Sequence, residues 1–209
     1  MSHYAGLCGL IYLTFCLVAR GQTVSKGPDK KASYPAKPIT LDETRLRQAI
    51  LDSAAVFVGM VEISNQNDAP WIARINRYNG LPIRSAYCAS GFYYAHRVNG
   101  VKLPIKALGA VSSYFSVSAK IIYRHNQRGN QRLGIMPRRM DAVSIYTSHI
   151  EGLVSDVWDS DDDYVTLIGF NTSAGRGTKY GCYINRRRKS EIKFIANWLT
   201  PYLATLKQQ

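Results

Sequence analysis

The hydrophobic pattern of this 209-residue chain changes its period near Asp141. Upstream, apolar residues recur every three or four positions, which is typical of amphipathic helices. Downstream, they form short, partly alternating runs typical of strands. The predicted strands are 142–146, 150–158, 164–170 and 180–185. Helices followed by an antiparallel sheet predict an α+β fold, with N-terminal helices packed on a C-terminal antiparallel sheet.

Two helices are predicted before the central part of the chain. The first covers about 41–59, where Thr40 and Glu43 have the spacing of a capping box. The second begins after Asp68 and ends at Asn79, next to a glycine.

Two other segments have less regular patterns. Residues 101–140 predict a short helix followed by polar loop. Residues 192–199 fit a strand by alternation and a helix by their three- and four-residue spacing, and both interpretations stay open.

A third helix is predicted to begin with a cysteine in its first turn. Ser85 is a good N-cap, which places Cys88 at the third helical position, and Asn99 followed by glycine is a plausible stop. The partial positive charge at a helix N-terminus favours a thiolate, which is the nucleophilic form of cysteine. Cys88 is therefore a candidate nucleophile, and the alternatives are a small buried apolar residue or half of a disulfide.

The N-terminus predicts export. An apolar run covers 7–19 and is too short to span a bilayer comfortably, so residues 1–21 are interpreted as a signal peptide cleaved before Gln22, with a retained anchor as the alternative. Polar, proline-containing residues 22–39 predict a flexible linker, and 40–203 the folded domain.

Cleavage at that point would leave two cysteines in an oxidising compartment. Cys8 and Cys16 would leave with the signal peptide, and Cys88 and Cys182 would remain. A disulfide between the remaining pair is the main structural alternative to thiol chemistry.

A cysteine nucleophile usually needs a histidine to accept its proton. His3 leaves with the signal peptide, and His96 lies about 12 Å along the helix of Cys88 at 1.5 Å per residue. His125 sits in a polar loop. His149, at the head of a predicted strand, is the remaining candidate.

The predicted hairpin that contains His149 also supplies a partner for its ring. Pairing the strands on either side of the acidic turn places His149 opposite Asn171 or Thr172, so Asn171 is the predicted orienting residue. Glu151 and Asp141 are the alternatives for that role.

The charge of the chain limits its partners. Lys and Arg number 27 against 14 Asp and Glu, a net charge of +13 that suits nucleic acid, an acidic membrane face or an anionic wall polymer. No nucleic-acid-binding motif is visible. The acidic turn at 159–163 could bind calcium but lacks the glycine and distal glutamate of an EF-hand loop, so no metal or cofactor is expected.

The order of these parts resembles the CHAP amidohydrolase/peptidase family, within the NlpC-type, papain-like cysteine hydrolases. The segments that carry the resemblance are Val61-Glu62, 65–70, 87–92, Pro137, 141–143, 148–154 and 168–172. It implies a papain-like fold in which Cys88 is the nucleophile, His149 the general base and acid, and Asn171 the orienting residue.

Three positions depart from the family pattern. Tyr87 stands where a tryptophan is common and is expected to contact substrate, and Met140 replaces a usual glycine. Gly169 occupies a position where many members carry a catalytic glutamate.

The resemblance implies a secreted cysteine amidase or endopeptidase that hydrolyses amide bonds of peptidoglycan. The expected protein is a monomer in the periplasm or outside the cell, bound to peptidoglycan or another wall polymer, with neither nucleic acid nor, after cleavage, a membrane as partner. The alternatives are a non-catalytic wall-binding or interaction protein on the same fold, and a basic nucleic-acid-binding protein, which would bind in a salt-dependent way.

Overall fold

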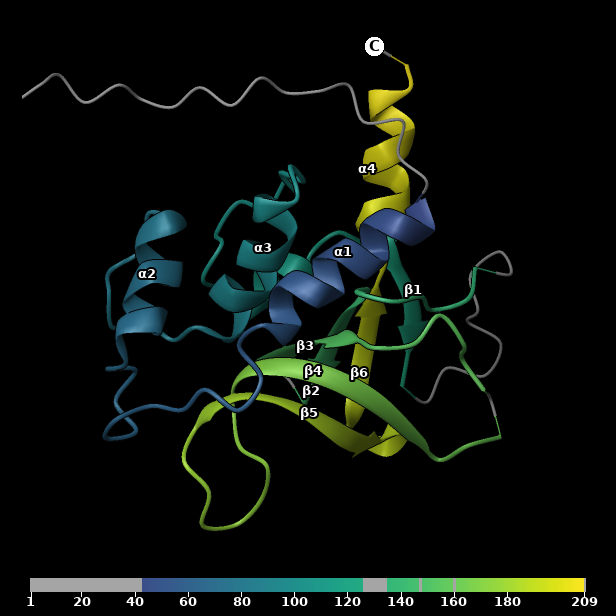
Figure 1. The fold of residues 1–209 in the computed structure, drawn as a ribbon. Coiled ribbons are helices and arrows are strands. Elements are labelled where there is room, and N and C mark those ends of the chain that lie inside the picture. The colour runs from purple at the N-terminus through teal and green to yellow at the C-terminus, as the bar shows by residue number, and fades with distance from the viewer. Residues whose placement is uncertain (1–42, 126–134, 147, 160, 209) are drawn as a thin grey trace, which may run out of the picture. The chain divides into compact units, whose positions relative to one another are not determined.

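Helices and strands combine in a mixed α+β fold in the computed structural model, which describes residues 43–125, 135–146, 148–159 and 161–208 (Figure 1). The helices are α1 (Glu43–Ala55), α2 (Pro70–Tyr78), α3 (Cys88–Val98) and α4 (Leu199–Leu206). The strands are β1 (Ile121–Arg124), β2 (Ala142–Ile145), β3 (His149–Leu153), β4 (Tyr164–Thr172), β5 (Gly181–Arg188) and β6 (Ile192–Ala196). Short 3-10 helices cover Val111–Tyr114, Ser118–Lys120 and Lys189–Glu191.

The strands of the described residues form one antiparallel sheet in the order β1-β6-β2-β3-β4-β5. In the β3–β4 hairpin Glu151 pairs with Gly169, and each pair sums to 320, which confirms one of the two predicted registers. If this register is continued by two residues along each strand, His149 lies opposite Asn171. Asn171 itself adopts φ +53 where the β4–β5 pairing is irregular.

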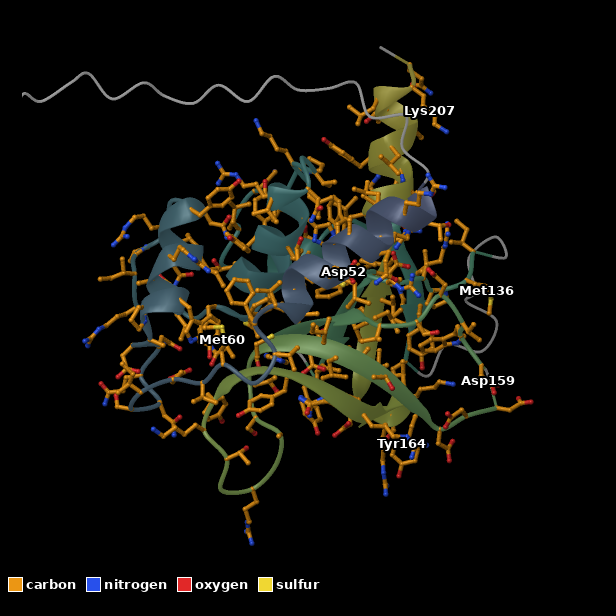
Figure 2. The ribbon with its side chains drawn as sticks, viewed as in Figure 1. Asp52, Met60, Met136, Asp159, Tyr164 and Lys207 are labelled. Atoms are coloured by element: carbon orange, nitrogen blue, oxygen red, sulfur yellow. The ribbon has the colours of Figure 1, made fainter. Side chains whose placement is uncertain are left out.

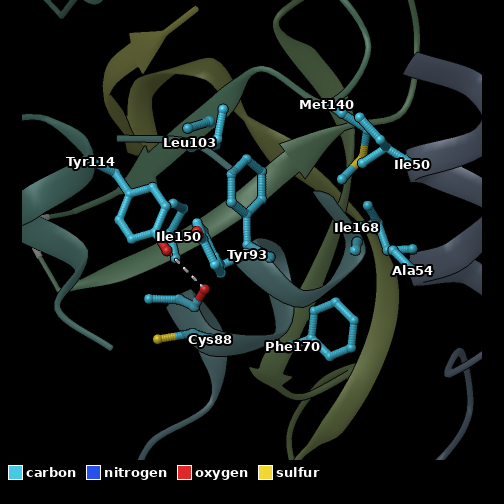
Figure 3. Close-up of a cluster of buried hydrophobic side chains, with 14 of the residues drawn as sticks. Ile50, Ala54, Cys88, Tyr93, Leu103, Tyr114, Met140, Ile150, Ile168 and Phe170 are labelled. Carbon is cyan, nitrogen blue, oxygen red and sulfur yellow. Dashed lines mark hydrogen bonds between the residues drawn. The ribbon is translucent and has the colours of Figure 1, made fainter. Parts of the chain in front are cut away.

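The two faces of the sheet bury different clusters. The larger core packs α1 and α3 against one face and includes Ile50, Phe92 and Ile150 (Figure 3). A second cluster on the opposite face includes Leu153 and Leu167. Since side chains alternate along a strand, His149, Glu151 and Leu153 lie on one side of β3 and Ile150 on the other.

Helix α3 lies unusually close to strand β4. A Cβ on Gly91 would come within 2.3 Å of the buried ring of Phe170, so only glycine allows this approach. Figure 3 shows Phe170 and Cys88 beside the first turns of this helix. The close packing fixes α3, and with it Cys88, relative to the sheet.

Several element boundaries differ from the prediction. The segment 101–140 contains strand β1 at an edge of the sheet, where a helix and loop were expected. The ambiguous segment 192–199 is a strand to Ala196 and a helix from Leu199, so both periodicities were present in it. Helix α4 continues to Leu206, beyond the boundary predicted at residue 203.

The predicted signal peptide, 1–21, and linker, 22–39, lie outside the described residues. None of the helices in the described ranges has the length and apolar character required to cross a membrane.

Candidate active site

Cys88 is the first residue of α3, not the third. Tyr87 occupies the N-cap position predicted for Ser85. The N–H of Gly91 donates to the Tyr87 carbonyl at 2.8 Å, so the N–H groups of Cys88 and Ala89 precede the first hydrogen bond of the helix. Unpaired amides and the helix dipole make this first turn a favourable environment for negative charge.

His149 joins the helix start to the sheet. Its side chain lies beside that of Cys88, whose thiol acts on its pKa, and its Nε2 lies 3.2 Å from Oε1 of Glu151. Because an imidazole has two nitrogens, Nδ1 is the atom that remains for the thiol. The structure therefore brings Cys88 and His149 together, and it adds a carboxylate on the other side of the ring.

The surroundings of His149 favour its charged form. Burial alone would lower the pKa of the ring, but the hydrogen bonds and charges of Cys88 and Glu151 outweigh it and raise the pKa to about 9. The ring is therefore an imidazolium at neutral pH. The side chain of His149 is 19% exposed and Cys88 is 6% exposed, so the pair reaches solvent mainly through the imidazole.

The buried His96 has a different environment. Its Nδ1 lies 2.9 Å from the Phe92 carbonyl one turn earlier, and burial lowers its pKa to about 4. This histidine is therefore neutral and bound to its own helix.

Glu151 is the fully buried centre of a chain of charged groups. Arg187 donates from Nη2 to Oε1 at 2.6 Å and from Nε to Oε2 at 3.2 Å. Burial would raise the pKa of Glu151, but hydrogen bonds and charges from His149 and Arg187 lower it below its usual value. Arg187 also donates to the Thr172 hydroxyl at 2.9 Å, which fixes its guanidinium. Glu151 is thus ionised and held in place against the imidazole.

Gly169 leaves the space that the Glu151 side chain occupies. A Cβ on Gly169 would lie 2.7 Å from both Cγ and Oε1 of Glu151. The two residues are direct cross-strand neighbours. The resemblance implies a glutamate at position 169, where this chain has glycine. The carboxylate of Glu151, on the adjacent strand, occupies that space instead.

Glu151, the alternative that the sequence offered, contacts the ring of His149 where Asn171 was predicted to do so. Among the described residues, Glu151 supplies the hydrogen bond to Nε2 of His149. Asn171 lies opposite His149 in the extended register, at a strand irregularity where its φ is +53. Its backbone lies near the Tyr87 hydroxyl and acts to lower the pKa of that group.

Tyr87 is buried and supports the site from within. Its side chain is 0% exposed, so the substrate contact predicted for it is wrong for this conformation. The hydroxyl donates to Oε1 of the buried Glu62 at 3.0 Å, and Oε2 of Glu62 accepts the N–H of Asn67 at 2.8 Å. Tyr87 therefore ties the nucleophile turn to the loop before α2.

Asp141, the other residue considered for orienting His149, instead stabilises the packing of the helices on the sheet. Its Oδ1 accepts a hydrogen bond at 2.9 Å from the fully buried guanidinium of Arg47. Arg47 also bonds Glu43 at 2.8 Å and Asn197 at 3.2 Å. This network ties α1 to β2 and to the end of β6, away from His149.

The two described cysteines, Cys88 and Cys182, are both free thiols and both buried. Cys182 pairs with Phe170 in the sheet, and its Sγ lies 3.9 Å from the Ala54 carbonyl. Burial, and then the charge of Glu151, raise the pKa of Cys182 to about 12. The disulfide considered from the sequence is therefore not formed, and Cys182 is an inert packing residue.

Within the described ranges, no three His, Cys, Asp or Glu residues are grouped so that they could hold a metal ion. In the acidic turn, Asp159 and Asp162 accept hydrogen bonds from backbone N–H groups at 2.8 and 2.9 Å.

No family model, curated protein or solved structure matches this chain.

Proposed function

We propose that this chain is a cysteine hydrolase of amide bonds, with a papain-like, CHAP-type arrangement of its catalytic residues. One observation carries the proposal: Cys88 at the start of a helix lies beside His149, whose Nε2 is held by an ionised Glu151. A nucleophile, a base and an orienting group in this order are the parts that acyl transfer requires.

In the proposed mechanism the thiolate of Cys88 attacks the amide carbonyl. The oxyanion forms beside the backbone N–H of Cys88, in the first turn of α3. The imidazolium of His149 donates its proton to the leaving amine, the C–N bond breaks, and a thioester remains. Neutral His149 then takes a proton from water, the resulting hydroxide attacks the thioester, and the proton returns to the His149–Cys88 pair as the acid leaves.

Glu151 positions His149 in both steps. Because its carboxylate is buried and bound by Arg187, it holds the ring toward Cys88 without accepting the proton itself. The same negative charge stabilises the imidazolium from which the leaving amine is protonated.

We propose peptidoglycan as the substrate and export as the route to it. The support is the resemblance, the apolar run at 7–19 and the net charge of +13, which suits a polymer rich in carboxylates and phosphates. In this proposal the mature protein acts as a monomer in the periplasm or outside the cell.

The test is clearing of peptidoglycan in a zymogram. Cys88→Ala and His149→Ala should each abolish clearing, whereas the matched control Cys182→Ala, which removes the other buried thiol, should clear like wild type. Full clearing by Cys88→Ala would refute the proposal. Binding of the wall by the wild type without clearing would favour the alternative, a non-catalytic wall-binding protein.

A further inference from the structure

A pocket of about 470 Å³ opens where strand β6 begins and strand β2 ends. Its lining includes the basic residues Arg124, His125 and Lys193, together with the aromatic residues Tyr146 and Phe194 and the acidic residue Glu191. None of these residues belongs to the proposed catalytic chain, so the pocket is a separate feature of the fold.

The pocket adjoins the candidate active site. Tyr146 follows Ile145, the residue of β2 that pairs with His149. Arg187, which holds Glu151, also interacts electrostatically with both Tyr146 and Glu191. A ligand in the pocket would therefore lie near the β2–β3 hairpin, on which His149 begins the second strand.

Tyr146 has a conformation that tyrosine rarely adopts. Its φ is +53, in the left-handed region, and its side chain is 62% exposed. The backbone N–H of Tyr146 donates to the Glu191 carbonyl at 3.0 Å, and its hydroxyl donates to Glu191 Oε1 at 3.0 Å. These two hydrogen bonds hold the strained backbone and fix the ring of Tyr146 at the wall of the pocket.

The side chains of the pocket that would meet a ligand carry positive charge. The carboxylate of Glu191 is engaged by the Tyr146 hydroxyl and by the N–H of Arg188, at 3.0 Å each. Arg124 and Lys193 lie over the ring of Phe194, at 5.2 and 5.5 Å from its centre. An anionic group with an apolar stem fits two cations above an aromatic surface.

We infer that this pocket binds a carboxylate of the substrate, on the segment beside the bond that is cut, and so selects acidic amide substrates. The inference rests on the proposed function for the identity of the substrate. The carboxylate is expected to bind Lys193 and Arg124, with its stem against Phe194 and Tyr146.

The test measures binding in a variant that cannot cleave. Cys88→Ala protein is sedimented with purified peptidoglycan, either native or with its carboxylates converted to amides by carbodiimide and ammonia. Lys193→Glu is added in this background, and Lys207→Glu is the matched control, because it makes the same charge change on an exposed residue at the far end of α4 (Figure 2). Thermal unfolding checks that each variant is folded.

Loss of a hydrogen bond to a charged group corresponds to about tenfold or more in affinity. Lys193→Glu should weaken binding to native wall by that factor and remove most of the preference over amidated wall, whereas Lys207→Glu should keep the preference. Equal effects of the two variants, or no preference in the Cys88→Ala parent, would overturn the inference. Since the readout is binding, a wild type that shows this preference but never cleaves would contradict the proposed function alone.

Discussion

A single methyl group added to Gly169 should displace the residue that orients His149. In Gly169→Ala the new Cβ would lie 2.7 Å from Glu151 Oε1, and ordinary contact begins at 3.4 Å, so the oxygen must retreat by about 0.7 Å. A retreat directly away from the ring would lengthen the 3.2 Å contact with Nε2 to about 3.9 Å, which is no longer a hydrogen bond.

The expected size of this effect follows from the interaction that is lost. A hydrogen bond to a charged group contributes about 1.5–3 kcal/mol, and one pH unit of pKa corresponds to about 1.4 kcal/mol. The pKa of His149 should therefore fall from about 9 by roughly one to two units. Overpacking should also lower the free energy of unfolding by about 1–3 kcal/mol.

The assay is an NMR titration of the histidine ring in isotope-labelled protein, with urea unfolding in parallel. The control places Gly169→Ala in a Glu151→Ala, Arg187→Met background, where the methyl group has no carboxylate to displace and no unpaired cation is left. There it should change neither the pKa of His149 nor the stability. An unchanged pKa in the single variant would refute the argument that Glu151 holds the ring.

Three further predictions concern the same region. The rate of cleavage should fall as the pH rises through about 9, because His149 then loses the proton that the leaving amine needs; a rate that keeps rising to pH 10 would contradict this. Gly91→Ala should destabilise the fold by about 1–3 kcal/mol or more in urea unfolding, since Phe170 blocks the methyl group; a gain in stability would argue against the close approach. Tyr87→Phe should lower stability by about 1–3 kcal/mol because it leaves the buried Glu62 carboxylate short of a partner, and wild-type unfolding would show that the hydroxyl is dispensable.

Local patterns in the sequence were enough to locate the two side chains that are proposed to react. The helix period placed Cys88 in the first turn of a helix, and the acidic turn between two apolar runs limited the strands to two registers, one of which brings His149 opposite Asn171. Both predictions depend on spacing within a short segment. The structure adds the contact between the two segments.

Which residue contacts the ring of His149 could not be predicted from local sequence patterns, because the answer depends on tertiary structure. The irregularity at Asn171, with its positive φ, is not encoded in the alternation of apolar residues. Two signals in the sequence did favour Glu151: it lies two residues after His149, on the same strand face, and the predicted register places Gly169 opposite it. The helix cap was missed for a similar reason, because the Tyr87–Glu62 contact outweighs the local preference for Ser85.

Mass spectrometry of the fragments released from purified peptidoglycan tests the central claim most directly. The wild type should release fragments with a new amine and a new carboxylate, one water added for each bond cut, and Cys88→Ala should release none. Identical fragments from both proteins, or none from a wild type that is folded and has a free Cys88 thiol, would contradict the account.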